Sequence, residues 1–161
     1  MTMSTTQPAR HTVQVVRQRT TAALSRHSID LLRISLGLVF LVFGALKFVP
    51  GLSPAEPLVA RTMEVLTLGL LPEPVALFLV AALETFIGLA LLIGGRLLAA
   101  GLVALAVAMV GILSPLVLFA GDLLGAGPTL EAQYVFKDIV LVAAALVVTA
   151  KALGARLTVA R

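Results

Sequence analysis

The sequence predicts an all-α membrane protein: a polytopic four-helix bundle with a short interfacial helix between its first and second helices. Three observations predict this fold class. Hydrophobic residues make up 60% of the 161 residues and charged residues 12%, whereas a soluble domain is about 45–50% apolar and about 25% charged. The mean hydropathy is +1.09. The chain also contains four long apolar runs, each close to the roughly 20 residues that a helix needs to cross a bilayer.

The first 28 residues precede the apolar runs and are expected to form a basic, disordered cytoplasmic tail. They contain Arg10, Arg17, Arg19 and Arg26 and no acidic residue. Such a tail can also be attracted to anionic lipid headgroups. The apolar run that follows is too long for the core of a signal peptide, so it is expected to be a retained first helix.

The four spans are expected within one domain of residues 29–154, at about 29–49, 74–94, 97–120 and 133–153. Pro50-Gly51 closes the first span, and Gly154 ends the fourth. Pro115 should kink or end the regular part of the third span, because proline has no N–H for the helical hydrogen bond. Residues 155–161 then form a short cytoplasmic end.

The long loop between the first two spans contains an amphipathic pattern at 58–71. Its apolar positions recur at helical spacing, and Arg61, Glu64 and Thr67 gather on another face. The pattern predicts a helix that lies along the outer membrane surface or covers the bundle. It could simply close the bundle, or it could act as a gate for a substrate.

The distribution of Lys and Arg predicts the orientation, since short cytoplasmic segments of membrane proteins carry an excess of these residues. The amino-terminal tail is basic, Arg96 lies between the second and third spans, and Lys151, Arg156 and Arg161 lie at the carboxyl end. The two other loops hold Arg61 and several acidic residues. Both termini are therefore expected on the cytoplasmic side of the cell (inner) membrane.

Glu84 lies alone near the middle of the apolar run 75–95. At about 1.5 Å per residue this places its carboxylate near the bilayer midplane, where a charge is most costly. Arg33 in the first span lies nearest in expected depth, and a guanidinium suits a buried carboxylate. We therefore expect an Arg33–Glu84 pair inside the bundle, either as a structural ion pair or as part of a functional site.

Small residues should place these charges in the interior. In the first span Arg33, Gly37, Gly44 and Lys47 fall on one stripe, and in the second Glu84 and Gly88 do so. Because lipid gives helices no hydrophobic reason to associate, small residues mark close helix contacts. We expect both stripes to face the centre of the bundle.

A second group of polar residues is expected near the outer side. Lys47 ends the first span, and Tyr134, Lys137 and Asp138 begin the fourth. A Lys47–Asp138 pair would join these helices and leave Lys137 to meet a ligand or to snorkel. Asp138 could instead stabilise the start of its own helix, and Tyr134 could be an interfacial anchor.

Several chemistries are excluded within the chain or have no support. There is no Cys, which excludes disulfides and thiolate-held metal or iron–sulfur centres. The two His residues, His11 and His27, precede the first apolar run, so no metal site is expected. No nucleophile–base pair or nucleotide loop is visible, which argues against a standalone enzyme and leaves catalytic residues unknown. The basic tail lacks interleaved aromatic residues, so no nucleic-acid partner is expected.

The ordered motifs resemble the DoxX-like family of small four-helix membrane proteins (DoxX/DoxD/YkgB-type). The resemblance spans residues 30–153. It rests on the sequences RISLG at 33–37, GALKF at 44–48, Glu84 with Ile87-Gly88, LLIG at 91–94, PTLE at 128–131 and QYVFKD at 133–138. It implies a membrane subunit of a redox-associated assembly, with quinone as a candidate cofactor. Glu84, Arg33, Lys47, Tyr134, Lys137 and Asp138 are the candidate ligand-binding residues.

Three functions remain open at this point. The first is a subunit of a redox-associated, quinone-linked assembly that binds a lipophilic ligand or partner between its helices. The second is a non-catalytic scaffold or assembly factor whose buried charges fix the helix register. The third is a small transporter or proton-conducting protein, although no inverted repeat supports it. The lipid bilayer and either a membrane protein partner or a second copy of the chain are the expected partners.

Overall fold

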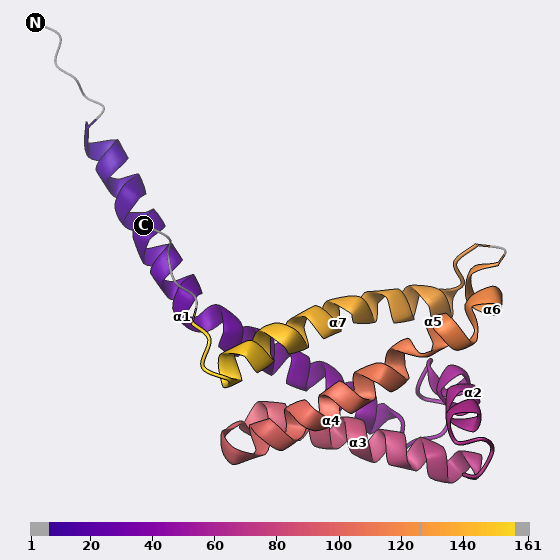
Figure 1. The fold of residues 1–161 in the computed structure, drawn as a ribbon. Coiled ribbons are helices and arrows are strands. Elements are labelled where there is room, and N and C mark those ends of the chain that lie inside the picture. The colour runs from indigo at the N-terminus through magenta and orange to yellow at the C-terminus, as the bar shows by residue number, and fades with distance from the viewer. Residues whose placement is uncertain (1–6, 126, 157–161) are drawn as a thin grey trace, which may run out of the picture.

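The computed structural model describes residues 7–125 and 127–156, and every named element in these residues is a helix (Figure 1). In chain order the helices are α1 Gln7–Leu46, α2 Glu56–Leu66, α3 Glu73–Ile93, α4 Gly95–Leu113, α5 Pro115–Leu118, α6 Ala120–Leu124 and α7 Leu130–Ala152. The all-α class predicted from the sequence is confirmed. The short α2, α5 and α6 gather at one end of the molecule (Figure 1).

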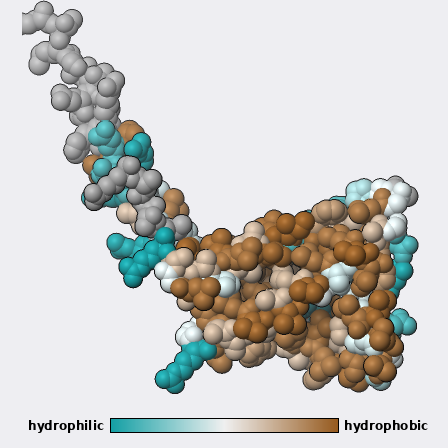
Figure 2. All heavy atoms as spheres, viewed as in Figure 1, coloured by the Kyte–Doolittle hydropathy of each residue, from teal (hydrophilic) through white to brown (hydrophobic). Residues whose placement is uncertain are grey.

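Three segments are long and apolar enough to cross a membrane: Thr12–Leu46 of α1, Glu73–Ile93 of α3, and Gly95–Leu118, which joins α4 and α5. They correspond to the first three predicted spans. Helix α7 is not among them, and it carries Lys137 and Asp138 in its first half, so the fourth span stays a prediction. The surface of the helical body in Figure 2 is mainly hydrophobic, with polar groups near its ends.

The basic tail was expected to be disordered, and for residues 7–28 this is wrong. These residues form the first half of α1, which projects from the body (Figure 1). The physical reason is local: no Gly or Pro interrupts the chain between Pro8 and Gly37, so the helix of the first span continues through the basic segment. Residues 1–6 lie outside the described residues.

Helices α1 and α3 form the closest contact in the body, and glycines make it possible. A Cβ added at Gly44 would lie 2.6 Å from the backbone nitrogen of Thr85, and one added at Gly88 would lie 2.4 Å from that of Leu41. Side chains larger than glycine do not fit at these distances. Gly37, Gly44 and Gly88 are all buried, which confirms that the two predicted stripes face the interior.

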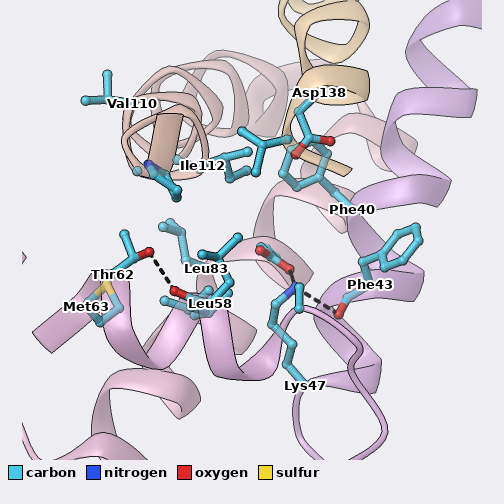
Figure 3. Close-up of a pocket in the computed structure, with 18 of the residues that line it drawn as sticks. Phe40, Phe43, Lys47, Leu58, Thr62, Met63, Leu83, Val110, Ile112 and Asp138 are labelled. Carbon is cyan, nitrogen blue, oxygen red and sulfur yellow. Dashed lines mark hydrogen bonds and ion pairs between the residues drawn. The ribbon is translucent and has the colours of Figure 1, made fainter. Parts of the chain in front are cut away.

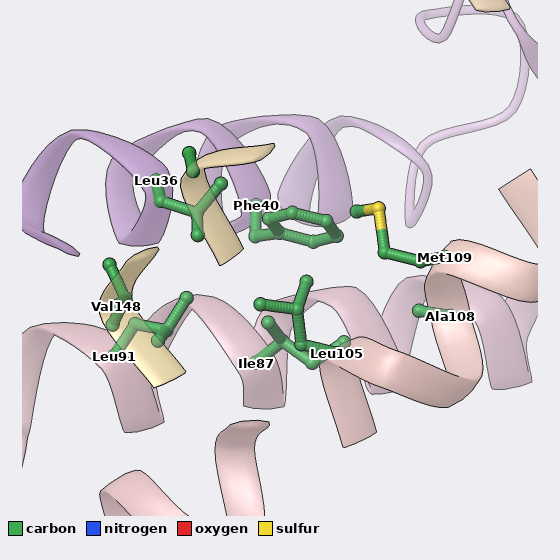
Figure 4. Close-up of a cluster of buried hydrophobic side chains, with 9 residues drawn as sticks. Leu36, Phe40, Ile87, Leu91, Leu105, Ala108, Met109 and Val148 are labelled. Atoms are coloured by element: carbon green, nitrogen blue, oxygen red, sulfur yellow. The ribbon is translucent and has the colours of Figure 1, made fainter. Parts of the chain in front are cut away.

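One hydrophobic core joins all four long helices (Figure 4). It combines Leu36 and Phe40 of α1, Ile87 and Leu91 of α3, Leu105, Ala108 and Met109 of α4, and Ala144 and Val148 of α7. Many large aliphatic residues outside this core, such as Val103, are exposed. An exposed apolar surface of this extent is what a lipid-embedded protein presents.

Three further helix boundaries follow from one or two residues each. The helix predicted at 58–71 runs from Glu56 to Leu66, because Leu68 and Gly69 take left-handed φ values of 54° and 70° and turn the chain. The predicted break at Pro115 is confirmed, since α4 ends at Leu113 and α5 begins at Pro115. Helix α7 begins at Leu130, where the Thr129 hydroxyl accepts a hydrogen bond from the Ala132 N–H.

Candidate functional site

A cavity of about 660 Å³ lies between α1, α3, α4 and α7, with α2 forming a further wall. This volume is within the range of about 300–1,000 Å³ that is usual for small-molecule sites. Most lining side chains are apolar, including Phe43 of α1, Met63 of α2 and Ile112 of α4 (Figure 3). The polar lining comes from Lys47, Thr62, Glu84, Tyr134 and Asp138.

The central polar feature is an ion pair between α1 and α3. The Lys47 Nζ lies 2.6 Å from the Glu84 Oε2 and also donates to the backbone oxygen of Phe43 at 3.4 Å (Figure 3). The two side chains are only 6% and 8% exposed. Because the pair is taken out of solvent, each charge needs the other to offset its desolvation.

The predicted Arg33–Glu84 pair is therefore wrong. The Arg33 guanidinium donates through Nη1 to the backbone oxygens of Leu91 and Leu92, the latter at 3.3 Å. It lies against Gly94, where a Cβ would be 3.2 Å from Nη1. Arg33 thus satisfies carbonyl groups that the end of α3 leaves without helical partners.

The register of the two helices explains this exchange of partners. Gly37 contacts Leu91 and Leu92, Leu41 contacts Gly88, and Gly44 contacts Glu84 and Thr85. Lys47, one turn beyond Gly44, therefore lies beside Glu84, whereas Arg33 is one turn before Gly37 and lies at the far end of α3. Depth estimated from the span limits did not reveal this offset, because the register of α1 against α3 is set by the close contacts at the glycines.

The predicted Lys47–Asp138 pair is also wrong, since Lys47 is engaged by Glu84. Asp138 nevertheless lines the same cavity and interacts electrostatically with both Lys47 and Glu84. In Figure 3 its side chain leaves α7 close to the Phe40 ring. Within residues 7–125 and 127–156, Asp138 forms no ion pair.

Tyr134 and Lys137 differ in their relation to the cavity. Tyr134 lines it while remaining half exposed. Lys137 does not line the cavity; its Nζ lies 5.2 Å from the centre of the Tyr134 ring, a cation–π contact. Of the six predicted residues, the structure gathers Lys47, Glu84, Tyr134 and Asp138 at the cavity, and it places Arg33 and Lys137 elsewhere.

The contribution of α2 to the cavity wall was missed at the level of individual residues. Leu58, Val59, Thr62, Met63 and Leu66 all face the cavity. The Thr62 hydroxyl donates to the Leu58 backbone oxygen at 2.6 Å, so this polar group is satisfied within its own helix. The apolar face of the amphipathic pattern was the available signal, but it did not distinguish a cavity wall from a membrane-surface helix.

Arg61 of α2 contacts α6 and the residue between α5 and α6. The Arg61 Nη2 lies 2.6 Å from the Asp122 Oδ2, and the guanidinium carbon lies 4.0 Å from the centre of the Phe119 ring. Both members of the ion pair are more than half exposed, so solvent screens their attraction. Leu58 of α2 also packs against the buried cluster of Phe119, Leu123 and Ala132, so apolar contacts as well as Arg61 connect α2 to this end of the body.

A second, smaller cavity of about 160 Å³ lies at the opposite end of the body, beside Asp30, Arg33 and Lys151. There the Lys151 Nζ lies 2.7 Å from the Asp30 Oδ1 and ties the end of α7 to α1. In the described part of the chain no three His, Cys, Asp or Glu residues are grouped as metal ligands would be.

Comparison of the chain with protein-family models, with curated proteins and with solved structures gives no match.

Proposed function

We propose that this protein is a multi-pass integral membrane protein that binds a lipophilic ligand with a polar group in the cavity between its helices. The observation that carries the proposal is the composition of the cavity: broad apolar walls and one polar cluster of Lys47, Glu84 and Asp138. A few polar groups in an otherwise apolar pocket fix the orientation of a ligand. Entry from the bilayer would suit a ligand that partitions into lipid.

Quinone is the ligand class that the resemblance to DoxX-like proteins implies. A quinone ring carries carbonyl acceptors, and a lysine ammonium has three N–H donors. Glu84 and the Phe43 backbone oxygen engage two of those donors, so one can meet a ligand carbonyl, and the Tyr134 hydroxyl can meet another. A bound quinone would supply redox chemistry to an assembly in which this chain is the membrane subunit.

The proposal is tested by extracting the protein, purified in mild detergent, and measuring retained quinones and other lipids by mass spectrometry. A Met63→Trp variant should fill part of the cavity and lose the ligand. Val103→Trp is the matched control, because Val103 is exposed on α4 and does not line the cavity. Equal retention by both variants would place the ligand elsewhere, and no enrichment over bulk lipid would contradict the proposal.

A scaffold or assembly factor is the second candidate, and the projecting part of α1 favours it. This segment extends beyond the body (Figure 1) and exposes Val13, Val16 and Leu24 on a basic helix. An exposed apolar stripe of this kind is suited to a partner protein. Stable co-purification of a membrane partner, lost when these three residues are changed to Ser, would support this function.

The orientation belongs to the same proposal. The end of the body that carries Arg33, Arg96 and Lys151 would face the cytoplasm, with the protein in the inner membrane of the cell. The cavity and α2 would then lie toward the outer side of that membrane. Both described ends of the chain would then be cytoplasmic.

A further inference from the structure

The charges that line the larger cavity do not balance. Lys47 of α1 brings one positive charge, while Glu84 of α3 and Asp138 of α7 can bring two negative charges. The other walls add none: the lining residues of α2, α4 and α5 are apolar apart from Thr62 and Gly111. Lys137 neighbours Asp138 in sequence but lies outside the lining, against the Tyr134 ring. With both carboxylates ionised, the cavity carries one net negative charge.

An unbalanced carboxylate is costly in surroundings of this kind. The walls are mostly hydrocarbon, and an isolated charge in an apolar medium takes up a proton or a counterion instead of remaining bare. Lys47 is already held by Glu84 at 2.6 Å, so it cannot fully neutralise Asp138 as well. One positive charge, a proton or a cation, is missing from the cluster.

The remaining lining also suits a cation. Aromatic rings of Phe40, Phe43 and Tyr134 line the cavity, and Figure 3 shows Phe40 and Phe43 among the residues around it. The faces of aromatic rings attract cations, most strongly where water is excluded. Apolar walls for a hydrophobic body, ring faces and a spare carboxylate are therefore present in one cavity.

We infer that this cavity binds a lipophilic monocation in exchange for one proton. The inference rests on the proposed ligand-binding cavity and adds a ligand class different from quinone. In the empty cavity Asp138 holds a proton; when the cation binds, the carboxyl O–H bond breaks, the proton leaves to water, and the cation lies beside the Asp138 carboxylate. No other bond is made or broken. Lys47 stays with Glu84 throughout.

Tetraphenylphosphonium is a suitable probe, and tetraphenylborate is a nearly isosteric anion that controls for hydrophobic binding. We expect the cation to bind the detergent-purified protein at least about tenfold more tightly than the anion, since one unit-charge contact outside bulk water exceeds that factor. Calorimetry in two buffers of different ionisation enthalpy should detect release of about one proton per cation bound, in the pH range where Asp138 is protonated.

Variants separate the role of Asp138 from that of the cavity. Asp138→Asn should lower cation affinity at least about tenfold and abolish proton release, Asp138→Glu should retain both, and Asp30→Asn, at the opposite end of the body, should change neither. Equal affinities for cation and anion, unaffected by Asp138→Asn, would overturn the inference. If Met63→Trp then still weakens both probes, the proposed cavity survives. If neither probe binds and no lipid is retained, both proposals fail.

Discussion

Lys47 and Glu84 are the two side chains whose environment most constrains this protein. Glu84 lies in the middle of α3, and its partner comes from just beyond the last residue of α1. A buried ion pair adds little stability over well-packed apolar residues, but removal of one partner leaves an uncompensated charge. The pair therefore acts mainly as a constraint on which residues of α1 and α3 can lie side by side.

Lys47→Met should destabilise the protein by about 3–5 kcal/mol, because Glu84 would stay buried without its partner. The double variant Lys47→Met/Glu84→Met should recover most of that loss. Denaturant unfolding in detergent, followed by circular dichroism, measures both changes. Lys151→Met is the control: it breaks an ion pair whose side chains are 38% and 47% exposed, far more than those of Lys47 and Glu84, and should have a much smaller effect. A double variant no more stable than Lys47→Met would show that the two residues are not coupled.

Arg33 illustrates a role that the sequence could not reveal. Its charge and depth were visible, but its acceptors are backbone oxygens of Leu91 and Leu92, and backbone groups leave no mark in a residue pattern. Asp138, Tyr134, Lys47 and Glu84 were identified as candidate ligand-binding residues because ionisable groups and a hydroxyl stand out in apolar runs. Which of them pair depends on a helix register that only the packed structure defines.

Arg33→Leu should loosen the turn between α3 and α4. The variant removes the guanidinium donors to the end of α3, so amide hydrogen exchange at Gly94, Gly95 and Arg96 should accelerate, while exchange in the middle of α3 should not change. Mass-resolved hydrogen exchange in detergent measures this. Arg96→Leu, in the same turn but exposed, is the control. Unchanged exchange in the Arg33 variant would mean that its contacts do not hold the turn.

At the scale of elements, the contact between α1 and α3 depends on glycines at the crossing points. Gly44 and Gly88 each face backbone atoms of the other helix at distances that exclude a Cβ. Small residues are the main means by which helices approach closely in lipid. This contact also sets the register that brings Lys47 to Glu84, so the packing of the two helices and the polar cluster have a common origin.

Gly88→Ala should destabilise the protein by about 3 kcal/mol, at the upper end of the usual cost of overpacking, because the added Cβ would lie 2.4 Å from the Leu41 backbone nitrogen. Gly111→Ala in α4 is the matched control: nothing lies within 4 Å of its added Cβ, and alanine favours a helix more than glycine does. Denaturant unfolding of both variants in detergent measures their free energies of unfolding. Equal stability of the two variants would show that the α1–α3 contact can relax.

The limits of the elements were predictable where a single residue type determines them. Pro115 predicted the end of α4, and the lengths of the apolar runs predicted the first three spans. The helical state of residues 7–28 was missed, because a basic composition was taken as disorder although no helix breaker is present. The cavity could not be predicted, because its walls come from six helices and its volume depends on how they pack.

For the molecule as a whole, the direction of α7 follows from contacts near its two ends. Near its start, Tyr134 and Asp138 line the cavity beside Lys47; near its end, Lys151 is paired with Asp30. Helix α7 therefore runs antiparallel to the part of α1 between Asp30 and Lys47 and covers the same length of the body. If α1 crosses the bilayer there, α7 crosses it too, even with two charges in its first half.

The resulting topology is testable with single cysteines, because the chain has no native Cys. Thr21→Cys on α1, Arg96→Cys between α3 and α4, Ala155→Cys after α7 and Glu64→Cys on α2 all alter exposed positions. Excess Lys and Arg at the first three sites predicts that they are cytoplasmic. A membrane-impermeant maleimide applied to intact cells or right-side-out vesicles should label Glu64→Cys alone, and lysis should expose the others.

Labelling of Ala155→Cys from outside, with Thr21→Cys protected, would mean that α7 does not cross the membrane. In that case Asp138 and Lys137 would lie at the surface of the membrane, and the charge balance inferred for the cavity would no longer apply.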